Sequence, residues 1–157
     1  MTNKITSCLW FDSEAEDAAT FYVSVFKNSK IGDISRYSKE GFEFHGKPEG
    51  TVLTVAFTIN GQEFTALNGG PQFKFSEAIS FQVFCETQEE IDYYWDHLSK
   101  DGEEGQCGWL KDKFGVSWQI VPAILPALLA DTAKAGPVTM AFLQMKKFDI
   151  GALLKAF

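Results

Sequence analysis

The chain has 157 residues, of which 45% are hydrophobic and 22% charged, so it is long enough for one ordinary globular domain and too short for two full-sized ones. An aromatic content of 15% excludes an intrinsically disordered protein. The net charge of −7 disfavours nucleic acid as a partner, because that field repels a phosphate backbone.

Two further counts bear on location. No apolar run approaches the roughly 18 residues that a membrane span needs, so no membrane association is expected. Cys8, Cys85 and Cys107 are odd in number and lack CxxC spacing, which favours neither a disulfide framework nor a thiolate zinc site. We therefore expect a cytoplasmic protein.

The first half of the chain has the pattern of a strand, a helix and a small sheet. A β-branched and aromatic run ends at Asp12-Ser13, residues suited to capping a helix, and apolar residues then follow at helical spacing. Two alternating runs flank Asn60-Gly61, which is a strong hairpin signal. We expect strands over residues 5–11, 31–37, 51–59 and 62–67, a helix from about residue 14 to residue 28, and a loop over 38–50.

The second half repeats this order. Residues 79–85 predict a strand, and a helix with Ile91, Tyr94, Trp95 and Leu98 on its apolar face follows. Residues 109–111 and 116–121 then predict a hairpin, while the segment Gly102 to Gly105 is interpreted as a solvated turn. Two such modules joined by short connections predict an α+β fold.

Residues 123–157 differ from both modules. Their leucines and methionines, together with Gly136-Pro137 at a helix start and Asp149 at a cap position, predict an all-helical tail. A tail this apolar packs either on its own domain or on a second subunit, and the sequence leaves both open.

Several segments carry a family resemblance. They are Leu9-Trp10-Phe11-Asp12, Leu67-Asn68-Gly69-Gly70-Pro71, Ser80-Phe81-Gln82-Val83, Cys107-Gly108-Trp109-Leu110-Lys111-Asp112, Phe114-Gly115-Val116-Ser117-Trp118-Gln119-Ile120-Val121-Pro122 and Met145-Lys146-Lys147-Phe148-Asp149-Ile150. Together they resemble the PhnB-like proteins, which often carry the label 3-demethylubiquinone-9 3-methyltransferase. That family belongs to the vicinal-oxygen-chelate group, with glyoxalase I, bleomycin-resistance proteins and extradiol dioxygenases.

The resemblance implies a single glyoxalase-like domain over residues 1–157, with module one at 1–72, module two at 76–122 and the helical tail at 123–157. Its paired βαβββ modules would form a curved mixed sheet with a central cleft, in a homodimer. In chelating members, four His or Glu side chains hold a divalent metal. Here those positions fall on Ser7, Ser80, Gln119 and either Ala66 or Asn68. We therefore expect no metal site and no cofactor.

Strand alternation and the family register together predict the lining of a ligand cavity. If Ser7 faces the cavity, then Cys8 and Trp10 pack beneath the first helix. The expected lining suits a neutral, partly aromatic small molecule held by hydrogen bonds. The predicted cavity residues are Ser7, Leu9, Phe11, Asn68, Ser80, Gln82, Phe84, Ser117 and Gln119, with His45 brought to the cavity by its loop.

The remaining chemistry is sparse. His97 is interpreted as a surface residue, whereas His45 is either a plain loop residue or a proton carrier. No glycine-rich turn follows the first strand, so nothing supports the methyltransferase label. Three hypotheses stay open: a small-molecule-binding protein without a metal, a metal-dependent isomerase, lyase or dioxygenase, and a dimeric scaffold whose cavity has closed.

Overall fold

The computed structural model describes residues 4–157. Two compact units divide the chain, one ending at Lys74 and the other spanning Phe75–Phe157. Within residues 4–157, no helix is both long and apolar enough to cross a membrane. From here on, module one means the unit that ends at Lys74. Module two means the unit Phe75–Phe157, which includes the C-terminal tail.

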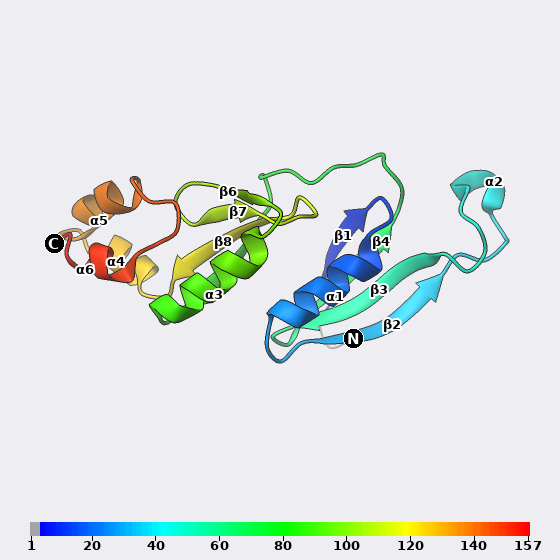
Figure 1. Cartoon of the computed structure of the whole chain (residues 1–157), viewed down its shortest axis with the longest axis horizontal. Coiled ribbons are helices and arrows are strands. Elements are labelled where there is room, and N and C mark those ends of the chain that lie inside the picture. Colours follow the sequence, from blue (N-terminus) through cyan, green and yellow to red (C-terminus); the bar gives the residue numbers. More distant parts are fainter. Residues whose placement is uncertain (1–3) are drawn as a thin grey trace. The chain divides into compact units, whose positions relative to one another are not determined.

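Module one is a four-stranded mixed sheet with one helix across a face (Figure 1). Strand β1 pairs in parallel with β4, and β4, β3 and β2 are antiparallel neighbours, in the order β1-β4-β3-β2. Its elements are β1 (Ser7–Phe11), α1 (Ala15–Val25), β2 (Lys30–Arg36), α2 (Phe42–His45), β3 (Val52–Ile59) and β4 (Gln62–Asn68).

Aromatic packing joins α1 to this sheet. Tyr22 of α1 is fully buried and stacks on Phe57 of β3 at 6.0 Å between ring centroids. Phe57 in turn stacks on Phe64 of β4 at 5.3 Å. This column of rings is a large apolar area removed from water, and it determines which face of the sheet the helix covers.

Module two has the same topology. Its sheet has the order β5-β8-β7-β6, with β5 and β8 parallel, and α3 packs against β5, β7 and β8 (Figure 1). The elements are β5 (Phe81–Cys85), α3 (Gln88–Ser99), β6 (Glu103–Glu104), β7 (Trp109–Lys111) and β8 (Ser117–Pro122), followed by α4 (Leu125–Ala130), α5 (Ala135–Phe142) and α6 (Ile150–Leu154). The predicted fold class, an α+β fold of two mixed sheets with C-terminal helices, is confirmed.

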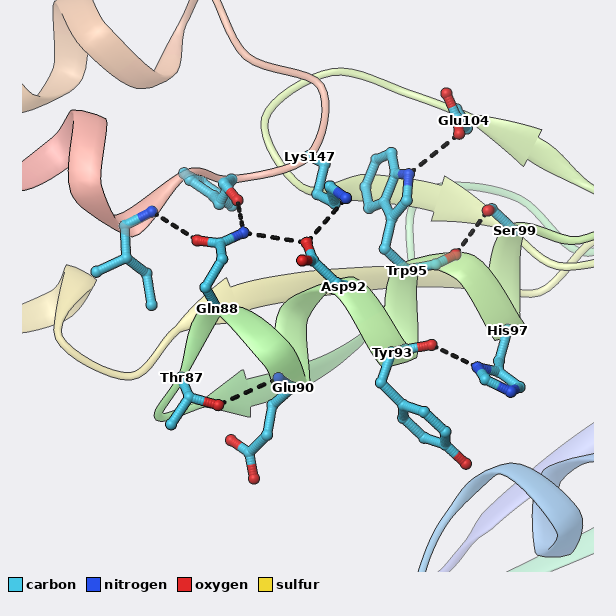
Figure 2. Close-up of polar contacts among 12 residues, drawn as sticks. Thr87, Gln88, Glu90, Asp92, Tyr93, Trp95, His97, Ser99, Glu104 and Lys147 are labelled. Atoms are coloured by element: carbon cyan, nitrogen blue, oxygen red, sulfur yellow. Dashed lines mark hydrogen bonds and ion pairs between the residues drawn. The ribbon is translucent and has the colours of Figure 1, made fainter.

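Hydrogen bonds and an ion pair join the C-terminal tail to α3 of its own module. Gln88 of α3, which is labelled in Figure 2, donates to the carbonyl of Phe148 (2.9 Å) and accepts from the amide of Ile150 (2.9 Å). Lys147 pairs with Asp92 at 2.8 Å, and this contact lowers the pKa of the Asp92 carboxyl and raises that of Lys147. Of the two arrangements left open for the tail, packing on its own domain is therefore present.

Three local predictions are wrong. Asp12 and Ser13 do not cap α1, because its N-cap residue is Glu14, without a side-chain cap bond. The expected loop over 38–50 contains one helical turn, α2. The acidic segment interpreted as a turn contains β6, whose Glu103 and Glu104 pair with Lys111 and Leu110 of β7. Backbone pairing with a neighbouring strand makes β6 a strand despite its charges, since β-propensity depends on context.

Candidate sites on the helix-free sheet faces

Helix α1 covers one face of the first sheet. Leu9 and Phe11 of β1 are 7% and 3% exposed, and the register places them beside Ala66 and Asn68 of β4. The side chain of Asn68 accepts a hydrogen bond from the amide of Ala15, the first residue of α1, at 2.8 Å. These side chains therefore lie on the helix side. We call the opposite face of each sheet its helix-free face.

The predicted facing of β1 is thus reversed. Alternation along the strand holds, but alternation alone does not say which set is covered. The set that contains Leu9 and Phe11 packs beneath the helix, where burial removes its apolar surface from water. Ser7, Leu9, Phe11 and Asn68 lie on the helix side, whereas Cys8 and Trp10, predicted beneath the helix, lie on the helix-free face.

Asn68 has a structural role in the module. Besides capping α1, its amide nitrogen donates to the carbonyl of Val52 at 3.1 Å, and its own carbonyl accepts from the Tyr37 hydroxyl at 2.6 Å. The side chain is 4% exposed. The side-chain amide of Asn68 therefore makes its hydrogen bonds to other residues of the protein. These bonds explain why a polar side chain is buried here, and no ligand is needed to explain it.

The helix-free face of module one is partly covered by its own chain. Trp10 donates from its indole nitrogen to the carbonyl of Gly70 at 2.9 Å and meets Phe73 edge-on at 4.8 Å. Farther along this face lies a hollow of about 430 Å³. The hollow is lined by Thr6, Thr58, Thr65, Lys30 and Glu63, among others.

Module two follows the prediction more closely. Leu110, Trp118 and Ile120 are buried on the side that α3 covers. The register β5-β8-β7 then places the alternate residues on the helix-free face, with Gln82 beside Gln119 and Lys111 beside Ser117. The predicted cavity residues on this face are Ser80, Gln82, Phe84, Ser117 and Gln119.

These five residues differ in environment. Gln119 donates from its amide nitrogen to the hydroxyl of Ser80 at 2.8 Å. Phe84 is 52% exposed and Gln82 is also exposed. Ser117 is 1% exposed, and its buried hydroxyl finds no hydrogen-bond partner among residues 4–157. The face therefore presents amides, a hydroxyl and one aromatic ring.

Both histidines make hydrogen bonds within their own segments. The Nδ1 atom of His45 accepts from the amide of Lys47 at 2.9 Å, so its proton lies on Nε2, which faces the carbonyl of Glu40 at 3.2 Å. Its ring also packs on Tyr37 at 4.6 Å. The Nδ1 atom of His97 lies 2.7 Å from the carbonyl of Tyr93, one helical turn away (Figure 2). These contacts favour a loop-organising role for His45 and a surface role for His97.

In the part of the chain that the structure describes, neither the thiols nor the carboxylates assemble into a metal centre. Among residues 4–157, no group of three or more His, Cys, Asp and Glu side chains is arranged to hold a metal ion. Burial raises the pKa of the Cys85 thiol to about 12, with a smaller contribution from Glu90. Cys85 is therefore a protonated core residue and a poor nucleophile at neutral pH.

Sequence reasoning missed several residues on the helix-free faces. Thr6 and Thr65 line the hollow in module one, and Trp109 and Lys111 lie on the face of Ser117 in module two. The sequence of the hairpin β3–β4 could have located these residues. In these two strands one alternating set of side chains is apolar and the other is rich in threonine, and this contrast indicates that the helix covers the apolar set.

Comparison with known proteins gives a consistent result. The family model described as 3-demethylubiquinone-9 3-methyltransferase matches residues 3–121. The chain is 42% identical to the PhnB protein of Bacillus cereus, over 77% of this chain and 100% of that one, with a TM-score of 0.68. No curated protein matches.

Two more distant structures share the fold. One is a Pseudomonas aeruginosa protein, 14% identical over 77% of this chain and 98% of that one, with a TM-score of 0.60. The other is the fosfomycin resistance protein FosX of Listeria monocytogenes, in complex with Mn(II) and sulfate. It is 13% identical over 83% of this chain and 97% of that one, with a TM-score of 0.55.

Proposed function

We propose that this chain, which belongs to the protein family described as 3-demethylubiquinone-9 3-methyltransferase, binds a small organic molecule on its helix-free sheet faces without a metal ion. The observation that carries the proposal is Gln119. The resemblance to chelating relatives implies a glutamate ligand there, whereas this chain has a neutral amide whose nitrogen donates to Ser80. An amide binds a divalent cation poorly in competition with water.

The reversed facing of β1 strengthens this argument. The implied ligand position, Ser7, lies on the helix side, and its neighbours on the helix-free face are Thr6 and Cys8. Neither set supplies a carboxylate or an imidazole on β1, and Cys8 belongs to no group of three or more ligating side chains within residues 4–157. The expectation that no metal binds therefore does not depend on the register chosen for this strand.

The chemistry of module two suits a neutral, partly aromatic ligand. Exposed Phe84 offers a ring face, and Gln82 offers an amide donor and acceptor beside the Gln119–Ser80 pair. Small-molecule sites combine apolar surface with a few placed polar groups, and this face has both. The residues we assign to the site are Ser80, Gln82, Phe84 and Gln119; Ser117, predicted with them, is 1% exposed and lies beneath this face.

Benzamide is a suitable probe, because it is neutral and aromatic and carries one amide. In ¹H–¹⁵N spectra of the labelled full-length chain, we expect saturable shifts of the Gln82 and Gln119 side-chain signals. Gln119→Ala should weaken binding, whereas Gln62→Ala, which removes an exposed amide from the helix side of module one, should not. Unmoved signals in the wild-type chain would contradict the proposal.

A metal-dependent isomerase, lyase or dioxygenase is the second candidate, favoured by the fold shared with the Mn(II)-bound FosX structure. Elemental analysis of the purified chain and titration with Zn²⁺, Ni²⁺, Mn²⁺ and Fe²⁺ separate the two candidates. We expect no metal in stoichiometric amount. One tightly held ion per chain would favour the enzyme.

The methyltransferase activity in the family description is the weakest candidate. Strand β1 leads into α1 through Asp12, Ser13 and Glu14, with no glycine-rich turn of the kind that holds a nucleotide-like cofactor at a helix N-terminus. Isothermal titration with S-adenosylmethionine should show no binding heat. A saturable heat would restore this candidate.

A further inference from the structure

The hollow on the helix-free face of module one differs in its lining from the site in module two. Its volume is about 430 Å³, the size of a small-molecule pocket. Strand register places the lining on one face, because Lys30 of β2 pairs with Thr58 of β3, which pairs with Glu63 of β4. Ala56 and Thr65 form the next pair across β3 and β4.

Small residues give this hollow its depth. The register of β2 shifts between Ile31 and Ile34, and Gly32 lies within that irregularity. A Cβ atom on Gly32 would lie 3.3 Å from the carbonyl oxygen of Ala56 and 3.4 Å from its Cβ atom. The two strands therefore approach closely here, and the floor between them carries only one methyl group. A glycine inside a strand often marks a place where a ligand comes close to the backbone.

Three threonine hydroxyls of the hollow have no partner among residues 4–157. Thr6, Thr58 and Thr65 are each half-buried, and none of their hydroxyls forms a hydrogen bond within that range. Thr54, on the same face of β3, pairs its hydroxyl with that of Ser35 instead. A hydroxyl both donates and accepts, so the hollow offers three groups that can do either toward a ligand.

Charges of both signs border the hollow. Lys30 supplies an ammonium, and Asp33 and Glu63 supply carboxylates. Within residues 4–157, the Lys30 ammonium forms no ion pair. A singly charged ligand would be attracted by one sign and repelled by the other. A hydroxyl group instead accepts from the ammonium and donates to a carboxylate, so the mixture favours a neutral ligand with several hydroxyls.

The lining of the hollow offers no aromatic surface for stacking. Phe57 and Phe64 border it but are only 2% and 5% exposed, because their rings stack on each other on the helix side. An aromatic ligand of the kind proposed for module two would therefore find no ring partner here. The ligand of this hollow is recognised by hydrogen bonds.

We propose that this hollow binds a neutral molecule with several hydroxyl groups, of the class of monosaccharides and cyclic polyols. Its hydroxyls exchange hydrogen bonds with Thr58 and Thr65, accept from the Lys30 ammonium and donate to the Asp33 carboxylate. The inference rests on the proposed function for the choice of the helix-free face. It shares no residue with the site in module two, and it adds a ligand of different chemistry.

The test uses myo-inositol, a carbon ring with a hydroxyl on every atom, as the probe. In ¹H–¹⁵N spectra of the labelled full-length chain, we expect it to shift the backbone amide signals of Thr58 and Thr65 saturably, in the millimolar range. Cyclohexanol, cyclohexanecarboxylate and cyclohexylammonium have the same ring with a single neutral, anionic or cationic group. These three controls should leave both signals in place.

Three variants test the lining. Thr58→Val keeps the shape of the side chain but removes its hydroxyl, and it should weaken myo-inositol binding roughly two- to tenfold. Ala56→Leu fills the floor and should abolish binding. Lys30→Met, at an exposed position, should weaken binding as much as Thr58→Val, and it leaves the sheet packing intact if a strand variant unfolds. Thr20→Val, at an exposed threonine of α1, is the matched control and should bind normally.

The outcomes separate this proposal from the proposed function. No shift with myo-inositol, an equal shift with cyclohexanol, or tighter binding of the carboxylate or the ammonium would overturn the polyol site. Unchanged binding in both Thr58→Val and Lys30→Met would do the same. Benzamide shifts at Gln82 and Gln119 would then leave the proposed function standing. Failure of benzamide with a normal myo-inositol response would overturn the site in module two and leave the polyol site.

Discussion

Asp112 is the most consequential polar residue of module two, and replacing it by asparagine tests that statement. The residue is 2% exposed. Its Oδ1 atom accepts from the amides of Phe114 (2.9 Å) and Val116 (3.1 Å), and its Oδ2 atom accepts from the indole nitrogen of Trp118 at 2.9 Å. One carboxylate thus closes the β7–β8 turn and joins it to the core.

The expected loss of unfolding free energy depends on which hydrogen bonds asparagine can still make at this position. Its oxygen still accepts from both backbone amides, but its NH₂ group replaces Oδ2 and faces the donor of Trp118. Hydrogen bonds to charged groups contribute about 1.5–3 kcal/mol each, so Asp112→Asn should lower the free energy of unfolding by about 2–3 kcal/mol. Asp96→Asn, at an exposed position of the same module, should change it by under about 0.5 kcal/mol.

A double-mutant cycle isolates the indole contact. Trp118→Phe removes the donor, so adding Asp112→Asn to that variant should cost about 1.5–3 kcal/mol less than in the wild-type chain. Urea unfolding followed by circular dichroism gives the four free energies. A coupling energy below about 0.5 kcal/mol would refute the claim that this bond anchors the turn.

Two further predictions concern packing and pH. A Cβ atom added at Gly69 would lie 2.3 Å from the indole of Trp10, so Gly69→Ala should destabilise the chain by about 1–3 kcal/mol in urea unfolding, whereas Gly136→Ala, which meets nothing within 4 Å, should not. The raised pKa of Cys85, about 12 against 9.0, contributes stability below pH 9.0 that is lost as the pH rises toward 12. Cys85→Ala should therefore flatten the alkaline decline in unfolding free energy between those values, and an unchanged decline would contradict this assignment.

Local sequence determined most of the secondary structure. The Asn60-Gly61 turn and its flanking alternation located β3 and β4, and the helical spacing of Ile91, Trp95 and Leu98 located α3. These signals are strong because each lies within one element or one tight turn. The two-residue strand β6 lacked such a signal, since its glutamates pair only through contact with β7.

The facing of β1 needed the tertiary structure. Alternation separates Leu9 and Phe11 from Cys8 and Trp10, but both sets contain an aromatic residue, so the pattern does not indicate which one a helix covers. Parallel pairing with β4, whose Phe64 lies beside Ser7 at a separation of 64 − 7 = 57 residues, and the hydrogen bond from the amide of Ala15 in α1 to Asn68 of β4 decide it. A register between distant strands is a long-range property, and a shift of one residue reverses both faces.

The candidate site divides in the same way. The sequence by itself determined that the positions implied for metal ligands carry Ser7, Ser80, Gln119 and either Ala66 or Asn68, because residue identity is independent of the fold. Only the tertiary structure decided which of these side chains are accessible, since Gln82 and Phe84 are exposed whereas Ser117, on the same face of the sheet, is 1% exposed. The sequence thus limited the chemistry, and packing decided which of its polar groups remain for a ligand.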